Sequence, residues 1–144
     1  MTNPVTAILW PTFVLVALVY IVWFVMYVRR IGLMKRQPPT AEDFATSESS
    51  LRYFQPVDMP ANNLRNLFEM PVLYFALVPL LLIVHMANHI QVTLAWAYVV
   101  LRIVHSLIHA ASGPMMARFA AYALSCAVLA AMWIGFAVDI AAAS

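Results

Sequence analysis

Two histidines, an arginine and a tyrosine recur at helical spacing within one apolar stretch of the chain. Tyr98, Arg102, His105 and His109 follow one another at intervals of four, three and four residues. Residues at these intervals share one face of an α-helix. Guanidinium and imidazole groups bind anions and exchange protons. The spacing therefore predicts an inward-facing polar stripe that binds a charged ligand among apolar side chains.

Two shorter segments carry side chains of matching chemistry. Arg65, Asn66 and Glu69 lie close together, and their spacing predicts one helical face for Asn66 and Glu69. Arg118 and Tyr122 repeat a weaker polar face later in the chain. Because arginines outnumber the single glutamate in these segments, they favour an anion, or a zwitterion with spare carboxylates, as the ligand.

The composition indicates the class of protein to which these residues belong. Of the 144 residues, 65% are hydrophobic and 10% are charged, against about 45–50% apolar and about 25% charged in soluble domains. This excludes an ordinary soluble enzyme, a disordered tail and a nucleic-acid-binding module. The net charge of +2 is too small for a phosphate-binding face. We expect a small integral membrane protein that forms one compact unit.

Four apolar runs are long enough to cross a membrane, which takes roughly 20 residues. They predict an all-α fold, an integral membrane four-helix bundle in a single domain. The predicted helices cover about residues 7–28, 67–86, 93–111 and 116–138. The segment between the first two, about residues 29–64, is the one long polar connection. Its prolines and serines favour an irregular loop with a short amphipathic piece at about residues 44–54.

Basic residues orient this bundle. They lie in or beside the long connection and at the start of the fourth helix: Arg29, Arg30, Lys35, Arg36, Arg52, Arg65 and Arg118. The second connection and both termini carry no lysine or arginine. By the positive-inside rule, the first and third connections are cytoplasmic and both termini lie outside. The polar stripe then lies in the cytoplasmic leaflet.

Some of these residues also have a purely structural interpretation. In the first, Glu69 and Arg102 form a buried ion pair between two helices. In the second, Arg65 and Arg118 are boundary residues whose side chains extend to the lipid headgroups. A buried carboxylate in a four-helix chain is also typical of small proton-coupled exporters, although the surplus of arginine counts against that function.

The four histidines suggest a metal or haem site as a further alternative. His85 and His89 are four residues apart, as are His105 and His109, and this spacing suits ligands on a helix. The first pair falls at the outer end of the second helix and the second pair in the inner half of the third. Because the pairs lie at different depths, no metal or haem is expected.

Three segments together resemble one family. Residues 63–71 (NLRNLFEMP), 101–109 (LRIVHSLIH) and 118–122 (RFAAY) are similar to the MAPEG family, the membrane-associated proteins in eicosanoid and glutathione metabolism. The resemblance covers nearly the whole chain, including the four spans and the long first connection. The chain looks most similar to a bacterial member, which implies the bacterial inner membrane as its location.

The resemblance implies a homotrimer that binds glutathione between adjacent subunits at the cytoplasmic leaflet. The implied activity is that of a glutathione transferase or a lipid-hydroperoxide peroxidase acting on a hydrophobic electrophile. Glutathione is then a co-substrate, the membrane lipids and the other subunits are the partners, and no nucleic acid is bound. Since some members bind lipids or partner proteins without evident catalysis, a non-catalytic lipid- or partner-binding scaffold is the alternative.

The resemblance also assigns roles by position. Arg118 takes the catalytic role of stabilising the glutathione thiolate. Glutathione binding falls to Arg30, Arg65, Asn66, Glu69, Arg102, His105, His109 and Tyr122. Among these, Arg30 extends from the neighbouring subunit, with Arg29 as its competitor. His109 stands where several eukaryotic members have a tyrosine, so a titratable ring replaces a fixed hydroxyl.

Overall fold

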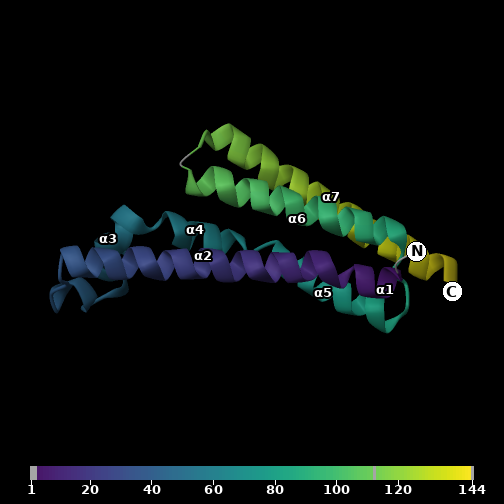
Figure 1. Cartoon of the computed structure of the whole chain (residues 1–144), viewed down its shortest axis with the longest axis horizontal. Helices are drawn as coiled ribbons and strands as arrows, with labels where there is room; N and C mark the ends of the chain where they lie inside the picture. The colour runs from purple at the N-terminus through teal and green to yellow at the C-terminus, as the bar shows by residue number, and fades with distance from the viewer. Residues whose placement is uncertain (1–2, 112, 144) are drawn as a thin grey trace.

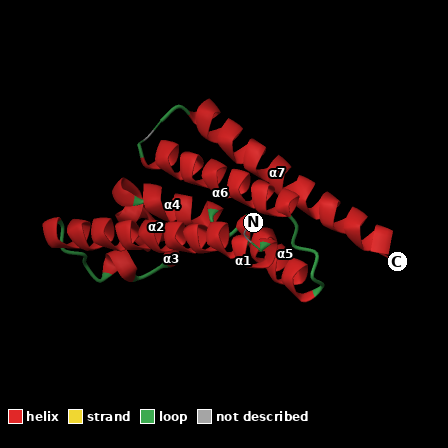
Figure 2. Cartoon of the chain, turned by 45° about the vertical axis from the view of Figure 1, so that its right-hand side comes forward, coloured by secondary structure: helices red, strands yellow, loops and turns green. Residues whose placement is uncertain are grey.

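The computed structural model describes residues 3–111 and 113–143. In this part of the chain every regular element is a helix, and no strand is present (Figure 2). Four helical segments are long and apolar enough to cross a membrane: Pro4–Arg36, Met59–Ile83, His89–Ala110 and Met115–Ala143. They lie side by side as an elongated bundle (Figure 1). The predicted all-α membrane bundle is therefore confirmed.

The first span is longer than the sequence predicted. The short helix α1 (Pro4–Ala7) leads into α2 (Leu9–Arg36), which continues past the predicted end at Val28. Hydropathy falls at that point, but arginine, leucine, methionine and lysine are all good helix formers. Basic side chains in the last turn also favour the negative end of the helix dipole. The helix therefore extends about two turns beyond the apolar run.

The second span is broken, and its second helix is shorter at both ends than the predicted helix over residues 67–86. It consists of α4 (Met59–Asn66) and α5 (Pro71–Ile83), joined by turns. Pro71 lies in the first turn of α5 rather than inside a helix, where a missing backbone N–H costs least. Beyond α5, His85 adopts a φ of 57°, the left-handed conformation that ends helices.

The long connection is more ordered than predicted. Besides the end of α2 and most of α4, it holds a 3₁₀ turn (Glu42–Phe44), α3 (Ser47–Phe54) and a second 3₁₀ turn (Gln55–Val57). Thr46 and Ser49 form a capping box at the start of α3. Two hydrogen bonds from Thr40, both 2.8 Å long, hold the pKa of the Asp43 carboxyl below its usual value. Local hydrogen bonds and the mutual contacts of the Phe44, Tyr53 and Phe54 rings thus give structure to this segment.

The last two spans form an antiparallel pair (Figures 1 and 2). Helix α6 (His89–Ala110) begins earlier than predicted because the Asn88 side chain caps it, accepting a hydrogen bond from the Gln91 N–H. Helix α7 (Met115–Ala143) continues past the predicted end at residue 138. In the turn between them, a Cβ at Gly113 would lie 2.8 Å from Ile108 Cγ2, so only glycine fits there.

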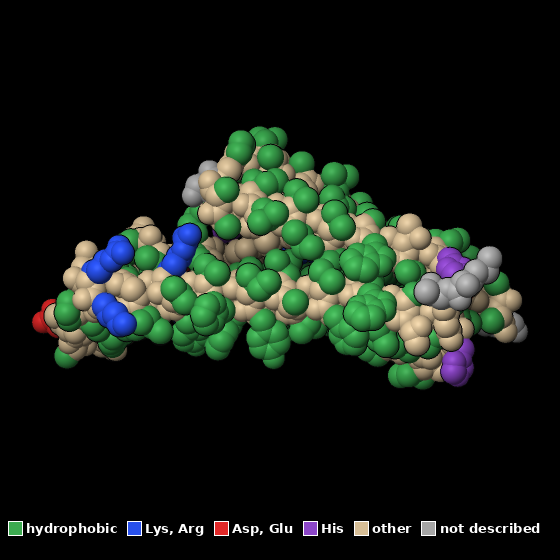
Figure 3. All heavy atoms as spheres, viewed as in Figure 1, with side chains coloured by type: hydrophobic (Ala, Val, Ile, Leu, Met, Phe, Trp, Pro, Cys, Tyr) green, Lys and Arg blue, Asp and Glu red, His purple; other side chains and the backbone are tan. Residues whose placement is uncertain are grey.

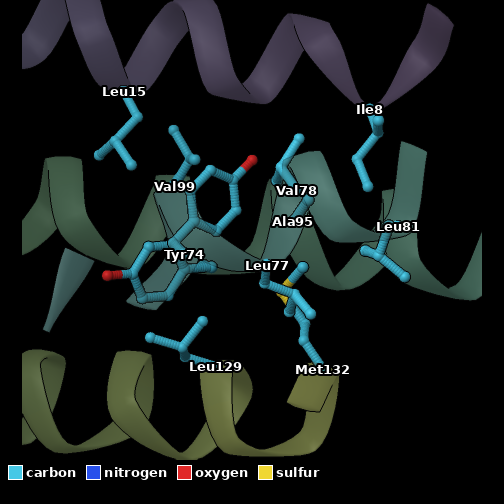
Figure 4. Packing of buried hydrophobic residues seen from close by; sticks show 11 residues of the cluster. Ile8, Leu15, Tyr74, Leu77, Val78, Leu81, Ala95, Val99, Leu129 and Met132 are labelled. Carbon is cyan, nitrogen blue, oxygen red and sulfur yellow. The ribbon is translucent and has the colours of Figure 1, made fainter. Parts of the chain in front are cut away.

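The core joins all four spans. Figure 4 shows Leu15 of α2, Tyr74 and Leu77 of α5, Val99 of α6 and Leu129 of α7 packed together, and each of these side chains is at most 1% exposed. The Tyr74 ring also stacks on that of Tyr98, with centroids 5.1 Å apart. This cluster fixes α5 against α6, which carries the polar stripe.

Replacing one leucine at the centre of this core tests the packing. We expect Leu77→Ala to lower the free energy of unfolding by about 2 kcal/mol, the low end of the range for buried leucines. Lipid is as apolar as the core, so lost dispersion contacts rather than transfer from water account for the effect. Reversible unfolding in mixed micelles with an anionic detergent measures it. Leu80→Ala, at an exposed site of the same helix, is the control, and equal losses would contradict the packing.

Candidate functional site

The polar stripe of α6 faces the interior, as its spacing predicted. Tyr98 and Arg102 are fully buried, and His105 and His109 are 3% and 5% exposed. Ser106, which the stripe prediction did not include, is buried beside them. A helix inside a membrane turns its polar groups toward partners in the protein, so the partners of each group define the site.

Arg102 lies at the centre and is incompletely satisfied. Its Nη2 donates a hydrogen bond of 2.6 Å to the backbone oxygen of Asn66. Its guanidinium carbon lies 5.4 Å from the centre of the Tyr122 ring. Nε and Nη1 are buried without a hydrogen-bond partner, although a guanidinium carries five N–H donors. An acceptor with two oxygens would complete this arrangement.

His105 connects α6 to the start of α7. Its Nδ1 lies 3.1 Å from the backbone oxygen of Arg118, and its ring centre lies 5.7 Å from that of Tyr122. Because a carbonyl oxygen only accepts hydrogen bonds, Nδ1 carries the proton. Nε2 is buried and has no partner. In the neutral ring it is therefore a free acceptor.

The break in the second span alters the predicted contacts of Glu69. Helix α4 ends at Asn66, which leaves the backbone oxygen of Asn66 without a helical partner and available to Arg102. The residues from Leu67 to Met70 are not helical, so the prediction that Asn66 and Glu69 share a helical face is wrong. In the described residues Glu69 belongs to no ion pair. The proposed buried Glu69–Arg102 pair is thus not formed within one chain.

Arg65 and Glu69 are both exposed on the single chain, whereas Arg118 and Tyr122 are half-buried. The structure therefore brings Asn66, Arg102 and Tyr122 into one cluster with His105 and the backbone of Arg118. Glu69 acts electrostatically on Arg102 and Tyr122 but forms no ion pair with Arg102 in the described residues.

The two arginines at the inner end of α2 have different surroundings. Arg30 forms an ion pair with Asp58 at 3.1 Å, and its guanidinium carbon lies 4.7 Å from the centre of the Phe54 ring. Arg29 is exposed and lies beside a cavity of about 120 Å³ between α2, α4 and α6. His109 lines the same cavity, and both of its ring nitrogens are buried without a partner.

Asn63 was not among the predicted site residues. This side chain is 2% exposed, and its Oδ1 accepts a hydrogen bond of 3.2 Å from the Ser106 hydroxyl. It lies one helical turn before Asn66 on α4. Two asparagines three residues apart already indicate, in the sequence, a polar helical face that turns inward.

A model of the MAPEG family matches residues 8–138 of the 144-residue chain. The chain belongs to the MAPEG family. The match covers all nine predicted site residues of this MAPEG protein, from Arg30 to Tyr122. Searches among curated proteins and among solved structures return no significant match.

The hydrogen bond between α4 and α6 is open to a direct test. A double-mutant cycle with Asn63→Ala and Ser106→Ala is expected to give a coupling energy of about 0.6 kcal/mol, the average that such cycles give for polar pairs in a membrane bundle. Unfolding in mixed micelles measures all four proteins of the cycle. Additive effects of the two substitutions would show that the bond does not hold α4 against α6.

Proposed function

We propose that this MAPEG protein binds glutathione and activates its thiol for attack on a hydrophobic electrophile. The family includes glutathione transferases and peroxidases. The observation that carries the proposal is the buried guanidinium of Arg102, two of whose nitrogens have no partner in the described residues. An unsatisfied buried charge is costly in a membrane protein, and a bound carboxylate would offset that cost.

The chemistry of glutathione matches the groups around Arg102. Glutathione carries two carboxylates, one amine and one thiol. Arg102 and Arg65 would bind the carboxylates, and Glu69 would bind the amine. The free Nε2 of His105 accepts a hydrogen bond, and Tyr122 lies against both Arg102 and His105. Asn66 completes this set, whereas His109, which the family resemblance also assigns to glutathione, lines the cavity between α2, α4 and α6.

A homotrimer would complete this site. Arg65 and Glu69 are exposed on the single chain, although they lie within the membrane-spanning segment Met59–Ile83. Charged groups at such positions face protein rather than lipid, so a second subunit is a fitting cover for them. Arg30 of that neighbour would then extend into the site, exchanging its contact with Asp58 for the ligand.

In the proposed reaction Arg118 stabilises the thiolate. A guanidinium near the sulfur favours the anion, which is the nucleophilic form. The thiolate attacks an electrophilic carbon, forms a thioether, and the leaving group departs with the bonding electrons. With a lipid hydroperoxide, the thiolate takes the terminal hydroxyl to form a sulfenic acid, and the alkoxide that leaves takes a proton from water to give the alcohol. A second glutathione then converts the sulfenic acid to glutathione disulfide and water.

The family resemblance implies a bacterial inner membrane, and the charge distribution supports an orientation in which the site faces the cytoplasm. Figure 3 shows basic side chains gathered at the end of the bundle near α3, and histidines at the end near the termini. Basic residues are enriched on the cytoplasmic side of membrane proteins. Both termini would then lie outside.

The role of Arg118 is tested by the ultraviolet difference spectrum on adding glutathione to the detergent-purified protein at neutral pH. We expect a saturable thiolate absorbance. In Arg118→Ala it should fall at least about tenfold, toward the small fraction shown by a free thiol whose pKa is near 8.5. Arg52→Ala, on the exposed face of α3, is the matched control.

Calorimetry on the same samples separates binding from activation. Glutathione should still bind to Arg118→Ala, since the remaining groups hold its charged ends. An undiminished thiolate absorbance in this variant would remove Arg118 from the catalytic role. Absence of both absorbance and binding in the unmodified protein would instead favour a non-catalytic lipid- or partner-binding scaffold.

Mixed trimers test whether two subunits share one site. Arg30→Ala and Arg118→Ala chains are each expected to be inactive in conjugating 1-chloro-2,4-dinitrobenzene. When the two are co-expressed in equal amounts, about a quarter of the sites in random trimers regain both arginines if these come from different subunits. Co-expression of Arg118→Ala with the double variant is the control, because it rebuilds no site. Mixed trimers no more active than this control would contradict the shared site.

A further inference from the structure

The cavity between α2, α4 and α6 has a polar end and an apolar end. Leu18, Val22 and Val25 line it along α2, while Arg29, Asn63 and His109 lie toward the basic end of the bundle. Figure 3 shows a recess between α2 and the α6–α7 pair, with basic side chains at one end. A ligand that fits this cavity has an apolar tail and a polar head.

The polar end of the cavity lacks partners. His109 is 5% exposed, and neither of its ring nitrogens has a hydrogen-bond partner. Arg29 belongs to no ion pair in the described part of the chain, whereas the adjacent Arg30 is paired with Asp58. One imidazole and one guanidinium without acceptors indicate an anionic head.

The size of the cavity limits the tail. Its volume of about 120 Å³ is close to that of cavities of about 150 Å³ that hold one benzene ring. From Leu18 to Arg29, α2 rises by about 16 Å. The space is therefore long and narrow, and it accommodates part of one hydrocarbon chain rather than two. Because its apolar wall offers few hydrogen-bond partners, water is a poor occupant of this part of the cavity.

We propose that this cavity binds one acyl chain of an anionic phospholipid, whose phosphate is bound by Arg29 and His109. Basic pockets between membrane-spanning helices bind such headgroups, and the anionic lipids of a membrane lie beside its basic ends. The second acyl chain stays in the bilayer. This lipid site lies within one subunit, and it does not depend on the proposed glutathione chemistry.

Native mass spectrometry of the detergent-purified protein tests the proposal. Dioleoyl phosphatidylglycerol is expected to bind saturably and about fivefold more tightly than dioleoyl phosphatidylcholine, the effect of one arginine on an anionic headgroup. Arg29→Gln should remove this preference. Lys35→Gln, at an exposed site further along α2 that does not line the cavity, should retain it.

A second pair of variants tests the acyl chain. Val22→Trp fills the cavity and is expected to lower binding of both lipids at least fivefold, while Phe24→Trp on the exposed side of α2 leaves binding unchanged. If Val22→Trp does not fold, Val25→Phe takes its place. Thermal unfolding checks that each variant is intact.

Three results would overturn the proposal. Equal affinity for the two lipids would show that the site does not recognise an anionic headgroup. An equal loss of the preference for phosphatidylglycerol in Lys35→Gln and Arg29→Gln would indicate attraction to the whole basic end of the bundle. Saturable binding of oleate without binding of phosphatidylglycerol would show that the cavity takes a free fatty acid instead. Glutathione binding, measured on the same samples, reports separately on the other site.

Discussion

The burial of one guanidinium inside a membrane-spanning bundle is the constraint on which the site depends. Arg102 is fully buried, and its direct hydrogen bond goes to the backbone oxygen of Asn66. That oxygen is free because α4 ends there and α5 begins at Pro71. The break in the second span and the charge on the third are therefore parts of one arrangement. An intact helix would occupy the acceptor and leave the arginine without it.

The same end of the bundle is held together by contacts distant in sequence. Arg30 binds Asp58 across 28 residues, and Asn63 binds Ser106 across 43. The first contact joins the segment before α4 to α2, and the second joins α4 to α6. Helix α4 is thus fixed between its neighbours on both sides. The Asn66 backbone at its end is positioned by these contacts rather than by its own short helix.

Hydropathy and helical period predicted the parts of the fold that depend on them. The four spans and the buried stripe through Arg102 and His105 follow from apolar runs and from spacing. The break after Asn66 does not, because hydropathy does not report backbone geometry. Pro71 does not mark the break by itself, because proline is tolerated as a bend within a membrane-spanning helix as well as in a first turn. Pairs such as Arg30 with Asp58 have no periodicity, so only the folded chain reveals them.

Adjacent residues with the same side chain show how one helix end serves two purposes. Successive residues on an α-helix point about 100° apart, so Arg29 and Arg30 cannot face the same neighbour. Arg30 turns toward Asp58 and Phe54, where its charge is compensated within the chain. Arg29 turns toward the cavity beside α6, where its charge is not compensated. Two adjacent basic residues that the positive-inside rule treats alike therefore differ in the folded chain, because the charge of Arg30 has a partner in it and the charge of Arg29 has none among the described residues. The contacts in the folded chain distinguish the two arginines, whereas the residue type alone does not.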